Sequence, residues 1–476
     1  MKKGRDQMDT CIGLGLRSLM RGLIPCLLVL WSSSLAAQDY ILIKNARIHT
    51  MGKDGILDPG MILIKGGKIE KIQAKIDLPP GAQVIDLSGK RIIPGMISAA
   101  SSLFLSGRDL VFPGDESPDT DILEGLNYFD ETIPEIVKQG VTTAYVSPVS
   151  FRSVGGLGAV VKLAIKEGGG IEVLKEEAGL RVNVERMENK QTSNLLRLTQ
   201  YQRVRDLFIQ AQDYRKGWRD YERKLAEYQE AQKSAKDKPA PKEGEAKEKP
   251  KEPEKPKKDE GKEIILQVID KKIPLRVEAH RPDAILNALR LGQEFGIKII
   301  VERGEDWPKV LPQLKENAAG LLSNPLLDYQ KYLIPGGSKG YAAGLLKARG
   351  DDFFYAGQGM SCEGLAKEAR EGWESLASAK VPFALIPPDH FPFSVRFLRF
   401  YASILMARGF TEEEALKAIT SSPAEILGVA SRVGSLEEGK DADLVVLDGE
   451  PLNSLSKVVL VFVNGINVWD SKNEKN

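Results

Sequence analysis

The chain has 476 residues, with 67 lysines and arginines against 66 aspartates and glutamates, for a formal net charge of +1. Hydrophobic residues make up 42% and charged residues 28%, a composition that supports a folded core and excludes a wholly disordered chain. The balanced charge argues against a nucleic-acid partner, because phosphate binding favours an excess of basic residues. The 3 cysteines are too few for a disulfide framework or for a zinc site built from cysteines.

The N-terminal residues have the composition of a secretory signal peptide. Basic residues precede a short apolar run over residues 22–31, and small residues follow it up to Ala37. The apolar run is shorter than the roughly 20 residues that span a bilayer, so we expect cleavage after Ala37 and no transmembrane span afterwards. An uncleaved membrane anchor is the alternative. Residues 1–37 therefore predict a secreted, periplasmic or cell-envelope protein of a bacterium.

Both ends of the remaining chain are rich in β-branched residues. Strand-like segments occupy residues 40–50, 84–94, 441–448 and 458–469. Gly66 and Gly67 join two further strand-like segments, and glycine supplies the positive φ that a two-residue hairpin turn requires. We therefore expect a small composite β-sandwich, with residues 38–93 as its N-terminal part and residues 429–476 as its C-terminal part.

Residues 94–428 alternate between strand and helix patterns. Strands are expected at residues 141–147, 273–280, 297–302 and 381–387. A helix is expected over residues 282–296, and Thr411 with Glu414 forms a capping box that begins another helix. Repeated strand–helix units favour a parallel sheet, and at this length a closed barrel is favoured over an open sheet. The expected fold class is α/β, a (β/α)8 TIM-like barrel plus the composite β-sandwich.

A charged insertion interrupts this pattern at about residues 201–262. Residues 201–230 carry aromatic side chains at mostly three-, four- and seven-residue steps, which predicts a long helix that packs on the body of the protein rather than on a partner. Residues 231–262 are rich in lysine, glutamate and proline, so burial cannot compensate the entropy lost on ordering. We expect this part to be a disordered surface segment.

Three motifs lie at the two ends of the expected barrel. They are Arg91-Ile-Ile-Pro-Gly-Met-Ile97, Thr420-Ser-Ser-Pro-Ala-Glu-Ile-Leu-Gly428 and Val433-Gly-Ser-Leu-Glu-Glu-Gly-Lys-Asp-Ala-Asp-Leu-Val-Val446. Together they resemble the amidohydrolase superfamily, in particular its imidazolonepropionase-like branch. The resemblance implies a divalent metal centre at the carboxyl ends of the barrel strands. It also implies hydrolysis of non-peptide carbon–nitrogen bonds, in which metal-bound hydroxide attacks a polarised substrate.

The resemblance places the family's metal ligands on this sequence. Members read Pro-Gly-(Leu/Met)-Ile-Asp-x-His-x-His after the first barrel strand, whereas here the two histidine positions hold Ala100 and Ser102. The family's His-Ala-His-Arg motif resembles the segment from Glu278 to Arg281, so His280 is retained. Where the next strand usually ends in Glu-His-Gly, Arg303 replaces the histidine.

Two further positions complete the set. The family's Thr-Asp-His-Pro resembles residues 388–391, so Asp389 is retained as the catalytic residue that orients or deprotonates the attacking water. Lys162 aligns with a middle-strand lysine, either as a carbamylated metal ligand or, as we favour, as a paired ammonium in the barrel core. Metal ligands are therefore expected at His280 and Asp389, with Lys162 as a third candidate.

This set falls short of a catalytic zinc site, which takes about three protein ligands and keeps one position open. Ala100 offers no donor, Ser102 is a poor neutral ligand, and Arg303 brings a permanent positive charge toward the place of a cation. Arg303 could also neutralise Asp389. Replacement ligands could come from Glu278, Glu302 and His390. The expected cofactor is none, or a weakly held divalent metal, zinc if any.

Three hypotheses about function follow. The first is a pseudoenzyme that has lost hydrolysis and now binds a small-molecule ligand, forms a homo-oligomer or pairs with an intact paralogue. The second is an active hydrolase with a reduced mononuclear site that uses His280 and Asp389. The third is a cell-envelope interaction protein that contacts its partner through the aromatic helix and the charged insertion.

Overall fold

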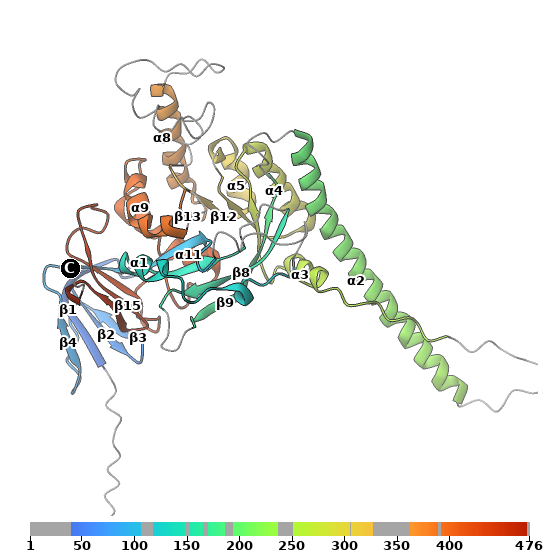
Figure 1. Cartoon of the computed structure of the whole chain (residues 1–476), viewed down its shortest axis with the longest axis horizontal. Coiled ribbons are helices and arrows are strands. Elements are labelled where there is room, and N and C mark those ends of the chain that lie inside the picture. Colours follow the sequence, from blue (N-terminus) through green and yellow to red (C-terminus); the bar gives the residue numbers. More distant parts are fainter. Residues whose placement is uncertain are drawn as a thin grey trace, which may run out of the picture. The chain divides into compact units, whose positions relative to one another are not determined.

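The computed structural model describes residues 40–105, 118–148, 153–164, 170–185, 194–236, 251–304, 306–326, 362–388 and 392–473 (Figure 1). The expected signal peptide, residues 1–37, lies outside the described residues. Within them, the strands form two eight-stranded sheets. The helices of these ranges include none that is long and apolar enough to cross a membrane.

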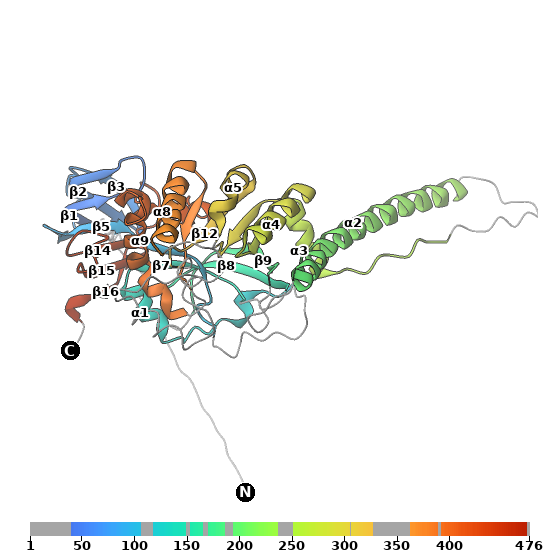
Figure 2. The ribbon, with the colours of Figure 1, turned by 90° about the horizontal axis from the view of Figure 1, so that it is seen from above.

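The first sheet combines strands from both ends of the described chain, and Figure 2 shows β1, β2 and β3 together with β14 and β15. Its strands are β1 (Tyr40–His49), β2 (Ile56–Lys65), β3 (Lys68–Gln73), β4 (Gln83–Asp86), β5 (Arg91–Pro94), β14 (Leu444–Leu447), β15 (Val458–Val463) and β16 (Ile466–Asp470). β5 pairs antiparallel with β14 and parallel with β1, so this pairing joins the two halves. The expected composite β domain is confirmed.

The hairpin between β2 and β3 turns at the two glycines that the sequence singles out. Gly66 and Gly67 have φ angles of 55° and 81°, in the region that favours glycine. A Cβ on Gly67 would lie 2.8 Å from the carbonyl oxygen of Asn464, so this turn is also packed closely against the loop between β15 and β16. Glycine at this position therefore serves both the turn and the contact.

The second sheet is the barrel. Its strands are β6 (Met96–Ser101), β7 (Val141–Val146), β8 (Val154–Lys162), β9 (Val173–Asn183), β10 (Leu275–Glu278), β11 (Ile299–Glu302), β12 (Ala318–Ser323) and β13 (Phe383–Leu385), side by side in this order. Cα atoms of the end strands β6 and β13 approach within 8 Å, so the sheet nearly closes on itself. The expected α/β fold with a TIM-like barrel is confirmed.

Strand β8 departs from the expected (β/α)8 pattern. It runs antiparallel to both β7 and β9, whereas all other neighbouring strands of the barrel sheet are parallel. The chain between Lys162 and Val173 is too short for the crossover of a dozen or more residues that parallel neighbours need. The expected repeat of identical strand–helix units is therefore corrected at this strand.

Helices pack on the barrel sheet through their apolar faces. The helices are α1 (Thr132–Lys138), α4 (Pro282–Phe295), α5 (Leu311–Asn317), α8 (Cys362–Ala379), α9 (Leu398–Met406), α10 (Glu412–Lys417) and α11 (Ser421–Leu427). Short 3-10 helices occupy Ile122–Gly125, Trp307–Val310, Pro392–Phe397 and Ser471–Asn473. α4 begins at a proline and ends before Gly296, whose φ is 64°. Thr411 and Glu414 form the expected capping box at α10.

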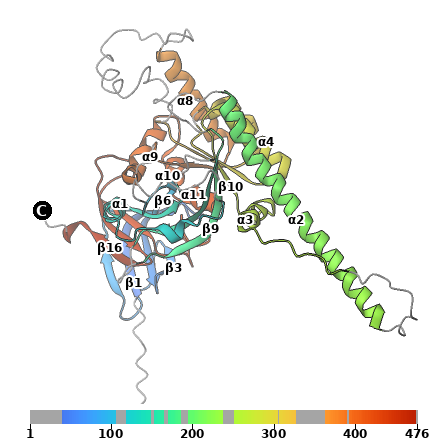
Figure 3. The same ribbon diagram turned by 45° about the vertical axis from the view of Figure 1, so that its right-hand side comes forward.

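The insertion forms two helices that pack together, α2 (Asn194–Lys236) and α3 (Glu260–Ile269) (Figure 3). Phe208 of α2 is buried and lies 5.1 Å from Phe295 of α4, measured between ring centroids, so α2 contacts the body of the protein as expected. Asp259 caps α3 through the backbone N–H of Lys262. The disorder expected for residues 231–262 is thus corrected at both ends, and residues 237–250 lie outside the described residues.

Candidate functional site

The inner face of the barrel carries charged side chains on three adjacent strands. The apolar residues Leu275, Val277, Ile299 and Val301 belong to the cluster that contains the buried face of α4. Side chains alternate between the two faces of a strand, so Arg276 and Glu278 of β10 and Glu302 of β11 face the barrel interior. Arg181 of β9 pairs in register with Arg276 and faces the same way.

These four residues form what we call the arginine–glutamate quartet: Arg181, Arg276, Glu278 and Glu302. Arg276 Nε lies 2.5 Å from Glu302 Oε1, and Arg181 Nε lies 3.1 Å from Glu302 Oε2. Arg181 Nη2 also lies 2.7 Å from Glu278 Oε2. All four residues are at least 94% buried. Their formal charges sum to zero, which is the condition under which buried ions are tolerated.

Arg276 extends the quartet to the opposite end strand of the sheet. Its Nη2 donates a hydrogen bond of 2.7 Å to the carbonyl oxygen of Ala99 in β6, and its guanidinium stacks 3.6 Å above the ring centroid of Tyr145 in β7. Arg181 Nη1 donates to the carbonyl oxygen of Pro148 over 2.9 Å. The quartet therefore connects β6 and β7 with β9, β10 and β11.

The electrostatics of the quartet keep the Glu302 carboxylate ionised. Burial raises the pKa of Glu302, but the guanidinium groups of Arg276 and Arg181 outweigh burial and hold that pKa below its ordinary value. Burial also raises the pKa of Tyr145 to about 12, so its hydroxyl is neutral at physiological pH. The interior thus contains two fixed positive charges, each already matched by a glutamate.

Ala100 and Ser102 lie next to this interior, at the end of β6. Ser98 and Ser101 pair with Ala144 and Val146 of β7, whose side chains belong to the outer cluster. Ala100 packs against the inner apolar cluster of Ala99, Ile300 and Leu322, whereas Ser102 is buried directly after the end of β6. The structure thus places Ala100 toward the barrel interior and Ser102 beside the barrel mouth.

His280 follows β10 at the same end of the barrel. Its Nε2 lies 3.3 Å from Glu278 Oε1, and its backbone N–H donates to Glu185 Oε2 over 2.9 Å. Glu185 also accepts from the backbone N–H of Arg281 over 3.0 Å, so one buried carboxylate fixes this loop. His280 is therefore held beside Glu278, which already pairs with Arg181.

Arg303 directly follows β11 and is 6% exposed, with a φ of 57°. Its Nη1 donates to the carbonyl oxygen of Pro388 over 3.2 Å, which places its charge beside the end of the last barrel strand. Asp389 and His390 lie outside the described residues. The structure therefore places Arg303 at the mouth of the barrel, as expected, and leaves the roles of Asp389 and His390 as predictions.

Lys162 lies at the other end of the barrel sheet. Because β8 runs antiparallel, Lys162 pairs with Thr143 near the beginning of β7, whereas His280 follows the end of β10. Its ammonium lies 2.8 Å from Asp441 Oδ2 and 3.0 Å from Asp443 Oδ1. The candidate role as a metal ligand with His280 is therefore corrected, and the alternative of a paired ammonium matches the structure.

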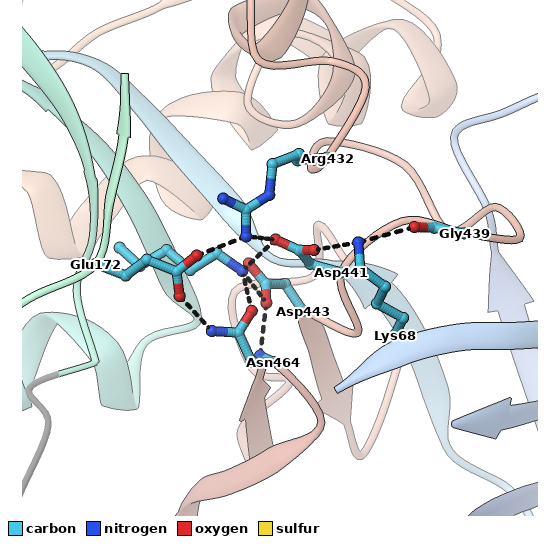
Figure 4. A network of polar contacts seen from close by, with 8 residues as sticks. Lys68, Glu172, Arg432, Gly439, Asp441, Asp443 and Asn464 are labelled. Atoms are coloured by element: carbon cyan, nitrogen blue, oxygen red, sulfur yellow. Dashed lines mark hydrogen bonds and ion pairs between the residues drawn. The ribbon is translucent and has the colours of Figure 1, made fainter. Parts of the chain in front are cut away.

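Lys162 belongs to a network at the junction of the barrel and the composite domain, which we call the junction network (Figure 4). Its members are Lys68, Lys162, Glu172, Arg432, Asp441, Asp443 and Asn464. Arg432 Nη2 lies 2.5 Å from Glu172 Oε1 and 2.6 Å from Asp441 Oδ2. The network lines part of a cavity of about 820 Å3 in the composite domain, away from the barrel mouth.

The described residues at the barrel mouth do not fit the divalent metal that the family implies. Within the described ranges, no three histidine, cysteine, aspartate or glutamate side chains are grouped so that they could hold a metal ion. Glu278 and Glu302 offer carboxylate oxygens, but both neutralise guanidinium groups. Ala100 contributes no donor. We therefore derive no chemical step through a metal.

Arg181 and Arg276 are the residues that the sequence analysis missed. A signal for them exists, because Leu275-Arg-Val-Glu278 places an arginine and a glutamate on one face of an otherwise apolar strand. A charged residue in a buried barrel strand needs a partner, so this pattern alone predicts an interior ion pair. The sequence does not say which other strands supply the partners.

Comparison with known proteins agrees with this fold. The family described as "Amidohydrolase family" matches residues 394–468. An imidazolonepropionase from Klebsiella pneumoniae (strain 342) is 34% identical over 77 residues, which cover 15% of this chain and 19% of that protein. The chain thus aligns with less than a fifth of that relative's length.

Solved structures extend the similarity over most of the chain. The crystal structure of an amidohydrolase from Thermotoga maritima MSB8 is 29% identical, with a TM-score of 0.68, and the match covers 90% of this chain and 100% of that one. A prolidase complexed with N-methylphosphonate-L-proline is 15% identical with a TM-score of 0.51, covers 91% and 100%, and shows the fold alone. The chain is thus similar to amidohydrolases in fold over most of its length and in sequence at residues 394–468.

Proposed function

We propose that this protein is an amidohydrolase-family pseudoenzyme, whose barrel has lost metal-dependent hydrolysis and which now binds a small molecule or a second protein. The observation that carries the proposal is the arginine–glutamate quartet. Glu278 and Glu302 are carboxylates of the described barrel interior, and both are engaged by guanidinium groups. Ala100 and Ser102 support the proposal, because neither replaces an imidazole as a metal ligand.

Ligand binding is supported by the cavity in the composite domain. Its volume of about 820 Å3 lies within the range of roughly 300–1,000 Å3 that small-molecule sites occupy. Charged side chains of the junction network, such as Arg432 and Glu172, line it together with apolar residues such as Ile64 and Phe462. A small amphipathic molecule fits this lining. The signal-peptide composition of residues 1–37 supports a location outside the bacterial cytoplasm.

Metal analysis of the purified wild-type chain tests the loss of hydrolysis. After incubation with zinc or manganese and removal of free metal, we expect far less than one ion per chain and no turnover of cyclic or linear amide substrates. A catalytic site would instead retain about one ion per chain. Such retention, combined with hydrolysis of a carbon–nitrogen bond, would refute the proposal.

His280 keeps the alternative of a reduced mononuclear hydrolase open, since it is a retained histidine at the barrel mouth. Under this alternative, Asp389→Asn abolishes hydrolysis because the water loses its base, whereas His49→Asn in the composite domain leaves hydrolysis unchanged. Equal activity of both variants and of the wild type would reject a catalytic role for Asp389.

A further inference from the structure

We propose that the positive charge of the Arg276 guanidinium takes the place of a metal ion in the barrel interior. We infer that it prevents a divalent metal from binding even when Ala100→His and Ser102→His restore the family's imidazoles. The inference rests on the proposed function and goes beyond it, because it names the side chain that excludes the metal. It also predicts what must change before the barrel can hold one.

The position of Arg276 is the first observation. Its Nη2 contacts the carbonyl oxygen of Ala99, the residue directly before Ala100, and its Nε contacts Glu302. The guanidinium therefore bridges the strand that has lost its ligands and the nearest carboxylate of β11. A metal ion bound to imidazoles on that strand and to Glu302 would need the same carboxylate oxygens.

The charge of Arg276 is the second observation. A guanidinium stays protonated at any physiological pH, so it cannot leave room for a cation by losing a proton, as a lysine could. Arg276 is 0% exposed, so solvent screens its charge poorly. A divalent ion placed beside it would be repelled strongly, and imidazole ligands add no negative charge to offset the repulsion.

An unsatisfied donor points the same way. Arg276 Nη1 is buried and has no hydrogen-bond partner in the structure. A buried N–H of this kind favours an acceptor oxygen, such as that of a water molecule, and disfavours a cation. The remaining space beside Arg276 therefore suits a hydrogen-bond acceptor and not a second cation.

The quartet also makes a metal unnecessary for holding the strands together. Through Arg276 and Arg181 it connects five strands of the barrel, from β6 and β7 to β11. We therefore expect the wild-type protein to have the same melting temperature in the presence of EDTA as in the presence of zinc. In a barrel that depends on its metal, chelation would lower the melting temperature.

Four proteins test the inference with zinc as the only added metal. They are the wild type, Ala100→His/Ser102→His, the same double variant with Arg276→Met, and Arg276→Met alone. Bound zinc is measured after gel filtration, and the melting temperature is measured with zinc and with EDTA. The expected result is about one zinc per chain and a zinc-dependent rise of a few degrees for the triple variant alone. In the triple variant the two imidazoles and Glu302 Oε1, which loses its contact with Arg276, supply three ligands, while Glu302 Oε2 stays paired with Arg181.

Arg276→Met alone is the matched control, because it frees Glu302 Oε1 without adding imidazoles and should gain nothing from zinc. If variants that lack Arg276 do not fold without metal, refolding with zinc replaces the melting experiment, and recovery of the triple variant alone supports the inference. Stoichiometric zinc in Ala100→His/Ser102→His with Arg276 present overturns the inference and leaves the proposed function intact. Failure of zinc to bind or rescue the triple variant also overturns it. Zinc in the wild type overturns the proposed function itself.

Discussion

The two ends of the barrel each contain a buried ionic network, and the two networks differ in kind. At the mouth, the quartet consists of arginines and glutamates within the barrel sheet. At the opposite end, the junction network joins Lys162 of the barrel to Asp441 and Asp443 of the C-terminal segment. The described residues of the mouth carry paired charges, whereas the junction contains the motif that the sequence shares with the family.

This difference explains what the sequence similarity means. The family match covers residues 394–468, which include Asp441 and Asp443 but no member of the quartet. The family match therefore includes residues that hold the barrel to the composite domain and leaves out the strands that carry the quartet. A protein can keep this attachment while its catalytic residues change, because fold and chemistry depend on different side chains. A function assigned from the C-terminal motif alone would therefore be based on residues that maintain the fold, and not on residues at the barrel mouth.

Removing the Lys162 ammonium from the junction network should have the largest effect. Lys162→Met leaves the buried Asp443 without its ammonium partner and takes one of three cations from Asp441, and breaking a buried pair in this way costs about 3–5 kcal/mol of unfolding free energy. Urea denaturation measures the change. Lys44→Met is the control, because Lys44 pairs with Asp86 at the surface and should cost less than about 1 kcal/mol. Similar values for both variants would contradict the buried role of Lys162.

A milder change in the quartet should have an intermediate effect. Glu302→Gln keeps the shape and one acceptor oxygen but removes the charge that matches Arg276 and Arg181, so we expect a loss of about 2 kcal/mol in the same assay. Glu260→Gln, at a surface pair with Lys258, serves as the control and should be near neutral. A stability equal to that of the wild type would show that the quartet is not held by charge.

The smallest expected effect is on the pH dependence of stability. Asp441 and Asp443 should change the unfolding free energy in opposite directions as the pH falls. Burial raises the pKa of both carboxyls; at Asp441 the contacts with Lys162 and Arg432 outweigh burial and lower the pKa below 3.8, whereas at Asp443 burial prevails and raises it. Asp441 therefore adds stability above its unfolded-state pKa, and this stability is lost as the pH falls through the folded-state pKa. For Asp443 the contribution is present at low pH and is lost as the pH rises through its folded-state pKa.

Denaturation of Asp441→Asn and Asp443→Asn between about pH 7 and about pH 3 checks this prediction. As the pH falls, the unfolding free energy of the wild type should decrease relative to that of Asp441→Asn. Over the same range it should increase relative to that of Asp443→Asn. Shifts of the same sign in both comparisons would show that the two carboxylates share one environment.

The parts of the fold that depend on neighbouring residues could be predicted from the sequence. The glycine hairpin and the capping box of Thr411 and Glu414 follow from contacts within a few residues. The direction of β8 could not be predicted, because all nine of its residues are buried. A strand that is buried on both faces shows no alternation and carries no sign of whether it runs parallel or antiparallel.

From the sequence, the candidate site could be predicted only as a list of positions at which the expected metal ligands are absent. The motif after β6 reveals that Ala100 and Ser102 stand where histidines are expected, and His280 and Arg303 lie at the barrel mouth as the alignment implies. The quartet could not be predicted, because Arg276 meets Glu302 from 26 positions away and Arg181 meets Glu278 from 97 positions away. Such pairs become visible only once the strands are placed in order.

The pairing of β5 with β14 has a consequence for biosynthesis. β5 ends at Pro94 and its partner begins at Leu444, so almost the entire chain must leave the ribosome before the composite sheet can be completed. Until then β5 is an unprotected sheet edge that contains Ile92 and Ile93, and such edges attract strands of other chains. A nascent chain that stalls before its last strands are made is therefore expected to aggregate unless a chaperone covers this edge.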